Sequence, residues 1–262
     1  MLAVPAPKRK SCPKVLQLLD VPELTAEEIQ ARVLHRDGLM LVIDKPSGLP
    51  VHRGPKGGAN LEASFDALRF GLPRPPVLAH RLDKDTSGCL VLGRHRKATA
   101  SLGLLFKHGK ISKTYWTVVE GGPAGNEGTI DLPLGRLNAE RGWWQKPDPE
   151  GQQAITNWKV LGRGDGLAWL AMEPVTGRTH QLRVHAASQG WPIVGDNIYG
   201  TQASLRRLRN EQFIPRFGEP RLHLHSREIG IPISKNKEPV HVTAPAPEHM
   251  RQRLRACGWN GE

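Results

Sequence analysis

The segment HRLDKDTSG, from His80 to Gly88, decides how the rest of the sequence is interpreted. It follows the proline-rich residues LPRPP and leads directly into CLVLG, Cys89 to Gly93, an apolar run of strand length. Arg81 and Asp83 stand close together, and turn-forming residues separate them from that strand. This layout predicts a carboxylate at the mouth of a sheet, partly shielded from water and still able to pair with a cation. Asp83 is therefore a candidate nucleophile.

The chain is strongly basic. It has 262 residues, with 37 Lys and Arg against 25 Asp and Glu, a formal net charge of +12 and a pI near 10.0. Such a field attracts polyanions, either nucleic acid or an anionic membrane surface. The alternative, that the excess charge serves only solubility, has less support, because natural excess charge is as often acidic.

The cysteines indicate a reducing compartment. Cys12, Cys89 and Cys257 are far apart, odd in number and form no CxxC pair, which argues against a disulfide framework and a zinc ribbon. No window approaches ~20 apolar residues, and the basic stretch Lys8 to Lys14 is not followed by a small-residue cleavage site. We expect a cytoplasmic protein without a membrane span, and we take a monomer as the default state.

The pattern of elements favours an α+β fold. We expect residues 1–30 to form a basic arm and lead-in and residues 31–262 to form one catalytic domain. Strands follow one another with few crossover helices, which predicts a mixed, mostly antiparallel sheet with flanking helices. The expected helices span residues 25–34, 61–70, 96–107, 179–189, 203–210 and 249–256, and the expected strands residues 39–43, 89–93, 112–120, 127–134, 153–161, 167–173 and 221–231.

Three common mechanisms lack their motifs. GxxxxGK[ST] is absent, and the glycine-bearing residues 54–58 are expected to form a turn. No GxGxxG opens a helix, so a dinucleotide cofactor has no support. Ser87 stands in TSG rather than in a GxSxG elbow, which disfavours a Ser-His-Asp hydrolase.

Histidine pairs offer a metal-dependent alternative. His180 and His185 form one pair, and His223 and His225, an H-x-H that a strand would place on one face, form another. Neither spacing is that of a zincin, and no cysteine stands beside them. Structural or phosphate-contacting histidines are the favoured interpretation, and no metal is expected.

Two arginines are candidate partners for Asp83. Arg178 and Arg183 both lie in TGRTHQLR, and at five residues apart a helix points them in different directions. One of them can hold the carboxylate while the other meets a phosphate. The alternative, a buried ion pair that only orders the core, stays open at this point.

Four segments together resemble a known family. HRLDKDTSG, KTYWTVVEG, TGRTHQLRVHAASQGWPIVGDNIYG and RLHLHS are similar, in order and spacing over residues 39–245, to the successive motifs of the RluA-type RNA pseudouridine synthases. KPSGLPVH, Lys45 to His52, resembles the usual lead-in. The resemblance implies a pseudouridine-synthase-like catalytic domain that isomerises specific uridines to pseudouridine in structured RNA, rRNA or tRNA, without a cofactor or metal.

The resemblance also implies residue roles. Asp83 matches the catalytic aspartate that acts on the ribose, and Arg81 an arginine that enters the RNA stack where the target nucleotide leaves. Tyr115 matches a tyrosine that stacks on the flipped uracil and helps to remove its C5 proton. Arg183 matches the partner of the catalytic carboxylate, and Leu224 the apolar floor of the pocket. The substrate-binding set is completed by His80, Thr86 and Arg178.

Physical chemistry is consistent with these roles. Flipping a nucleotide costs a few kcal/mol, which an inserted arginine and an aromatic platform can offset. A carboxylate suits a developing sugar cation, as in retaining glycosidases. Plainer roles remain as alternatives: cross-strand packing for Tyr115 and a surface salt bridge for Arg81. The alternative at the level of the whole chain is a non-catalytic RNA-binding protein on the same scaffold.

Features outside these motifs bear on substrate selection. Nothing before Leu39 resembles the RNA-binding module that many relatives carry at the N-terminus. The Lys8 to Lys14 arm is either a hook for RNA phosphates or a solvated tail, and Trp143-Trp144 either stacks on bases or packs a loop. Further phosphate contacts are expected from six arginines: Arg206, Arg207, Arg209, Arg216, Arg221 and Arg227.

Overall fold

The computed structural model describes residues 23–54, 57–137, 143–202, 222–234 and 236–261. The basic arm at Lys8 to Lys14, the expected helix at 203–210 and five of the six arginines lie outside this part of the chain. Arg227 lies inside it, where its guanidinium stacks over Trp116 at 4.1 Å and donates to the Ala244 carbonyl.

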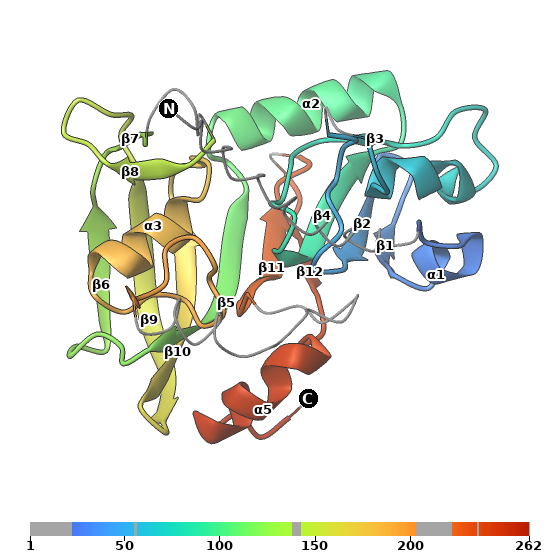
Figure 1. Ribbon diagram of the computed structural model, residues 1–262. Coiled ribbons are helices and arrows are strands. Elements are labelled where there is room, and N and C mark those ends of the chain that lie inside the picture. The colour runs from blue at the N-terminus through green and yellow to red at the C-terminus, as the bar shows by residue number, and fades with distance from the viewer. Residues whose placement is uncertain (1–22, 55–56, 138–142, 203–221, 235, 262) are drawn as a thin grey trace, which may run out of the picture.

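One mixed sheet forms the frame of the molecule (Figure 1). Its strands run in the order β1-β2-β4-β11-β5-β10-β9-β6, with β3 paired to β4 and β12 to β11, and β7 and β8 form a separate ribbon. The bounds are β1 Val33–Arg36, β2 Met40–Lys45, β3 Val77–Leu78, β4 Ser87–Gly93, β5 Ser112–Glu120, β6 Glu127–Asp131, β7 Leu134–Arg136, β8 Gln145–Pro147, β9 Ile155–Gly164, β10 Leu167–Pro174, β11 Leu224–Ile231 and β12 Val240–Thr243.

The chain crosses from one half of the sheet to the other at β4 and β11. Among the described strands this pairing alone is parallel, and it joins Ser87 to His225 and Gly88 to Ser226. Gly88 has a φ of +100°, and a Cβ there would overlap the Ser226 carbonyl. Only glycine therefore fits where the signature segment, residues 80–88, enters the sheet.

Helices cover both faces of the sheet (Figure 1). They are α1 Ala26–Gln30, the 3₁₀ helix η1 Leu61–Leu68, α2 Arg96–Lys107, α3 Gln181–Ser188 and α5 Glu248–Ala256. The expected helix at 25–34 is shorter, because the chain turns into β1, and Ile29 of α1 is fully buried beside η1 in the core. No described helix has the length and apolarity needed to cross a membrane.

Alternating side chains of the strands build separate cores. On β2, Leu41 and Ile43 join one cluster, whereas Met40 and Val42 join another on the opposite face. Tyr115 packs against the first of these clusters and also against the cluster that forms around β10 and α3. It therefore lies where two apolar cores meet. The expected α+β fold is confirmed.

Candidate active site

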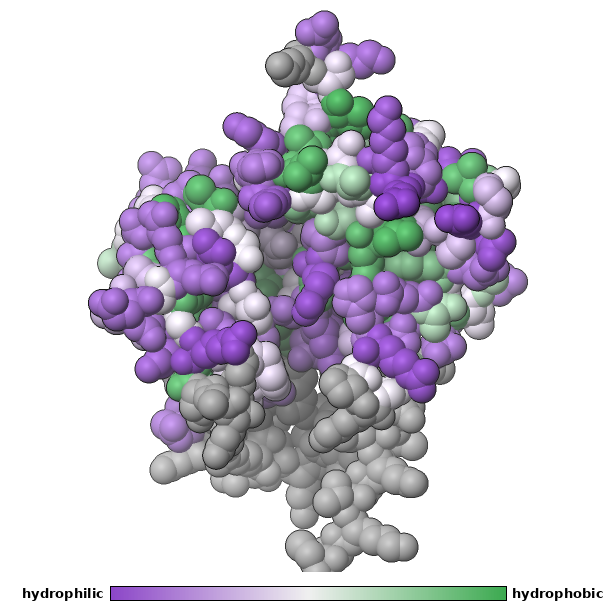
Figure 2. All heavy atoms as spheres, turned by 90° about the horizontal axis from the view of Figure 1, so that it is seen from above, coloured by the Kyte–Doolittle hydropathy of each residue, from purple (hydrophilic) through white to green (hydrophobic). Residues whose placement is uncertain are grey.

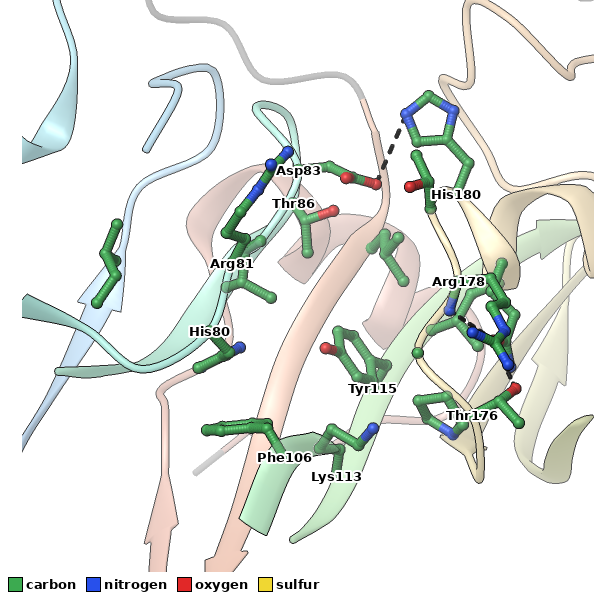
Figure 3. Close-up of a pocket in the computed structure, with 18 of the residues that line it drawn as sticks. His80, Arg81, Asp83, Thr86, Phe106, Lys113, Tyr115, Thr176, Arg178 and His180 are labelled. Atoms are coloured by element: carbon green, nitrogen blue, oxygen red, sulfur yellow. Dashed lines mark hydrogen bonds and ion pairs between the residues drawn. The ribbon is translucent and has the colours of Figure 1, made fainter. Parts of the chain in front are cut away.

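A cleft of about 750 Å³ opens between the signature segment and the turn that leads into α3. Figure 2 shows a hollow in the middle of the molecule seen from above, with both hydrophilic and hydrophobic residues around it. Figure 3 shows that its side chains come from the signature segment, β5 and residues 176–180. Every site residue expected from the sequence lines this cleft: His80, Arg81, Asp83, Thr86, Tyr115, Arg178, Arg183 and Leu224.

A buried lysine fixes the loop that carries Asp83. Lys45 is fully buried, and its Nζ donates to the carbonyls of Pro46, Lys84 and Thr86 at 2.8 to 2.9 Å. Burial lowers the pKa of Lys45 to about 7, although the nearby carboxylates of Asp85, Asp83 and Asp44 act in the opposite direction. The sequence interpretation missed this residue, whose only signal was a cation at the end of an apolar strand.

The His180 imidazole lies beside the Asp83 carboxylate. Its Nε2 lies 3.7 Å from Asp83 Oδ2, and its Nδ1 is 2.8 Å from the Tyr199 hydroxyl (Figure 3). The residue is buried and left-handed, with a φ of 53°, at the start of α3. Burial lowers the pKa of His180, with Asp83 opposing the shift. From sequence, His180 was weighed as a metal ligand and preferred as a structural or phosphate-contacting histidine, so its place beside the carboxylate is a finding of the fold.

Arg183 does not pair directly with Asp83, which corrects the expectation from sequence. Its Nε and Nη2 bind Asp196 Oδ2 and Oδ1 at 2.8 and 2.7 Å, and both side chains are buried. Burial alone would raise the pKa of Asp196, but the hydrogen bond and charge of Arg183 outweigh it and lower that pKa. Two of the guanidinium nitrogens of Arg183 are therefore already bound to Asp196. Arg183 Nη1 instead lies 3.4 Å from His180 Nε2, the same nitrogen that stands 3.7 Å from Asp83 Oδ2, so the histidine adjoins both groups.

Arg178 does not hold Asp83 either. Its Nε donates to the Gln153 carbonyl at 2.9 Å, and the residue is exposed where it lines the cleft. The expectation that one of the two arginines binds the carboxylate is therefore wrong in this structure. The exposed position leaves Arg178 suited to the other expected role, contact with a phosphate.

Tyr115 and Leu224 lie side by side in the sheet. Tyr115 is on β5, opposite Ser226 of β11, and Leu224 of the same strand is buried against the cleft. Burial raises the pKa of Tyr115, and the charge of Asp83 adds to the shift, while a hydrogen bond with Ser226 opposes it. A phenol that resists ionisation is a poor proton acceptor at neutral pH, so this geometry favours the stacking role.

The rest of the signature segment is fixed by backbone contacts. His80 stacks on Phe106 at 4.1 Å, and its Nε2 accepts from the Val91 amide at 3.0 Å. Burial lowers the pKa of His80 to about 3, so the ring stays neutral. The Thr86 amide donates to the Asp83 carbonyl at 3.2 Å, which closes a turn around the carboxylate, and Arg81 is exposed at the rim.

The other histidines of the metal alternative have protein partners. His185 is held by the Thr156 hydroxyl and the Leu132 carbonyl, and His225 by the Ser87 hydroxyl at 2.9 Å. His223 Nε2 lies 2.9 Å from Arg253 Nη1. Among the described residues, no group of three or more His, Cys, Asp or Glu side chains is arranged to hold a metal ion.

Trp143 lies next to the site. Its ring stands edge-on to His180 with the centroids 5.5 Å apart, and the residue is 58% exposed. Trp144 meets it edge-on at the same distance and is half-buried. Of the two roles considered from sequence, base stacking is therefore open to Trp143, whereas Trp144 packs the loop.

Comparison with known proteins identifies the family. Residues 39–188 match the model of the family described as RNA pseudouridylate synthase. The chain belongs to this family. It is 43% identical over 219 residues to a protein of Zymomonas mobilis named as an uncharacterized RNA pseudouridine synthase, covering 83% of this chain and 94% of that one.

Two further relatives extend the likeness. The ribosomal large subunit pseudouridine synthase C of Haemophilus ducreyi is 32% identical over 87% of this chain and 69% of its own. The structure of human RNA pseudouridylate synthase domain containing 4 superposes with a TM-score of 0.70 at 28% identity, covering 88% of this chain and 95% of that one. The family resemblance and the enzyme class expected from sequence, an isomerase of the pseudouridine synthase type, are confirmed.

Proposed function

We propose that this pseudouridine synthase isomerises specific uridines in structured rRNA or tRNA, that the target nucleotide flips into the cleft, and that Asp83 acts on its ribose. The observation that carries this proposal is the position of Asp83. Its carboxylate stands in the cleft beside His180, on a loop fixed by Lys45, and the exposed fraction of its side chain is 32%. A volume of about 750 Å³ is ample for one nucleotide.

The neighbouring side chains have separate roles in this proposal. Tyr115 offers a ring on which the extruded uracil can stack, which offsets part of the cost of removing it from the RNA. Arg81, exposed at the rim, takes the place that the nucleotide leaves in the stack. His180, anchored by Tyr199 and Arg183, holds the orientation of the Asp83 carboxylate through the reaction.

The wider surface suits RNA. The net charge of +12 draws a polyanion from a distance, and Arg178 lines the cleft where a flanking phosphate would pass. We further propose that the enzyme works in the cytoplasm as a monomer and needs neither a metal nor a cofactor, since the chemistry proposed for the cleft uses only a carboxylate, an aromatic ring and cations.

The test is pseudouridine formation by the Asp83→Asn variant. RNA from a strain that lacks the gene is incubated with wild-type or variant protein, and pseudouridines are mapped across rRNA and tRNA. The wild type should restore specific sites, and the variant should restore none while it binds the same RNA and keeps its thermal midpoint. Full activity of the variant would contradict the role of Asp83. If the wild type restores no site, the non-catalytic RNA-binding alternative replaces the proposal.

A further inference from the structure

Lys113 is a cation in the cleft to which the proposed function assigns no role. It lies two residues before Tyr115 on β5, and alternate residues of a strand face the same side. Figure 3 shows both side chains in the pocket, with the Lys113 ammonium beside the tyrosine ring. Phe106, labelled near Lys113 in Figure 3, also lines the cleft.

The ammonium of Lys113 has no counter-charge among its described contacts. Within the described ranges, no ion pair or side-chain hydrogen bond engages its ammonium, and the side chain is half-buried. Burial is the one cause that lowers the pKa of Lys113. A partly desolvated ammonium without a carboxylate is costly to maintain, and an anion delivered by the substrate would offset that cost.

Asp83 and Lys113 lie at different places in the cleft. Asp83 contributes to the pKa shifts of Tyr115 and His180, but not to that of Lys113. In Figure 3 the tyrosine ring lies between the carboxylate and the ammonium. A nucleotide with its ribose at Asp83 and its uracil over Tyr115 would thus point the far edge of the base at Lys113.

We propose that Lys113 stabilises the negative charge that the uracil carries while it is detached from the ribose. When the C1′–N1 bond breaks, its electron pair stays on the base, which becomes an anion with charge on N1, O2 and O4, and the sugar becomes the cation that Asp83 meets. The base then turns, and a pair from C5 forms the C1′–C5 bond. The C5 proton then leaves to a base in the cleft or to water, and N1 takes up a proton from water, so the product has the same atoms and electrons as the uridine.

This inference rests on the proposed function and extends it to the other half of the reacting pair. Bond cleavage separates charge along one axis, and the cleft carries a negative group at the sugar end and a positive group at the base end. Fixed charges that are complementary to charge developing in the transition state act on the rate rather than on binding. A phosphate is the less suitable partner, because a flipped nucleotide enters base first and Lys113 adjoins the stacking ring.

The experiment compares Lys113→Met with Lys113→Arg. Substrate RNA is prepared from the gene-deletion strain grown with [5-³H]uridine, and tritium release is followed in a single turnover with enzyme in excess. We expect Lys113→Met, which keeps the length and removes the charge, to slow the step about 100-fold. Lys113→Arg should recover most of the rate. Lys159→Met, which removes an exposed charge outside the cleft, is the matched control and should behave as wild type.

RNA binding separates this role from the alternatives. The dissociation constant for the same RNA, and its dependence on salt, should be unchanged in Lys113→Met. If Lys113 bound a phosphate instead, its loss would weaken binding and reduce the salt slope by about one. A normal rate, or a loss confined to affinity, would overturn the inference while wild-type activity still supported the proposed function. Wild-type protein without tritium release would overturn both. Circular dichroism and the thermal midpoint confirm that each variant is folded.

Discussion

The guanidinium of Arg183 binds both carboxylate oxygens of Asp196, at 2.8 and 2.7 Å, and so is not available to pair with Asp83 in the same way. Asp196 Oδ1 also accepts from the amides of Ile198 and Tyr199 at 2.9 Å. This buried pair ties α3 to the following turn and positions His180, which in turn faces Asp83. The Asp83 carboxylate, which we propose acts on the ribose, thus has His180 rather than Arg183 as its neighbour.

Breaking this pair should destabilise the fold strongly. In Asp196→Asn the Arg183 charge remains buried without its counter-charge, and we expect the free energy of unfolding in urea to fall by about 3–5 kcal/mol. The control is Asp66→Asn, which breaks the exposed pair with Arg69 and should change stability little. Equal stability of the Asp196 variant and the wild type would show that the pair is not structural.

Replacing His180 should slow catalysis more than it weakens RNA binding. Asparagine tolerates the left-handed backbone at this position, so His180→Asn keeps the turn and removes the contact with Asp83. We expect the single-turnover rate to fall about 10- to 100-fold, because the carboxylate loses its orientation. His241→Asn, an exposed change on β12, serves as the control. A change confined to RNA affinity would contradict a positioning role.

Lys45 should matter for stability as well as for the geometry of the signature segment. Lys45→Met leaves the buried carbonyls of Lys84 and Thr86 without their donor, and we expect a loss of about 2 kcal/mol or more in the free energy of unfolding. Lys84→Met removes an exposed lysine from the same loop and should be nearly neutral. Denaturation of the two variants in parallel decides whether the buried ammonium fixes the loop.

The close approach of β4 to β11 should exclude any side chain at Gly88. In Gly88→Ala the new Cβ would overlap the Ser226 carbonyl, and the φ of +100° adds strain. We expect a clear fall in thermal midpoint and in soluble yield. Gly103→Ala on α2 has open space around its Cβ and should instead stabilise the protein by about 0.5–1 kcal/mol. Similar effects at both positions would contradict the packing seen here.

Stability should fall on acidification, in part through His225. Burial lowers its pKa to about 3, against about 6.5 in an unfolded chain. Below pH 6.5 the unfolded state therefore binds a proton that the folded state does not, and stability is lost as the pH falls towards 3. At pH 5 the loss is about 2 kcal/mol from this residue alone. His225→Gln should flatten the pH dependence of unfolding, and an unchanged slope in this variant would contradict the assignment to His225.

Local patterns determined much of this protein from sequence alone. Alternation of apolar residues predicts β5 and β10 nearly to the residue, and α2 matches its expected bounds because its apolar positions recur with helical spacing. The length of the helix expected at residues 25–34 was overestimated, since its last residues belong to β1 and pair with β2. The residues that line the cleft were predicted from their motifs, because each motif is a short pattern that can be recognised directly in the sequence.

Which partner each charged group chooses was decided only by the tertiary structure. Asp83 is far from His180 and Arg183 in the sequence, which does not show which of these groups pair. The parallel β4–β11 pairing and the packing of α3 bring the three together. Asp196 competes for Arg183 because the turn after α3 folds back onto the helix. The burial that lowers the pKa of Lys45 depends on packing from several segments. The same is true of the position of Lys113, for which no ion pair is found among the described residues. The motif at His80 to Gly88 identified a segment that lines the cleft, and the fold decided which side chains surround it.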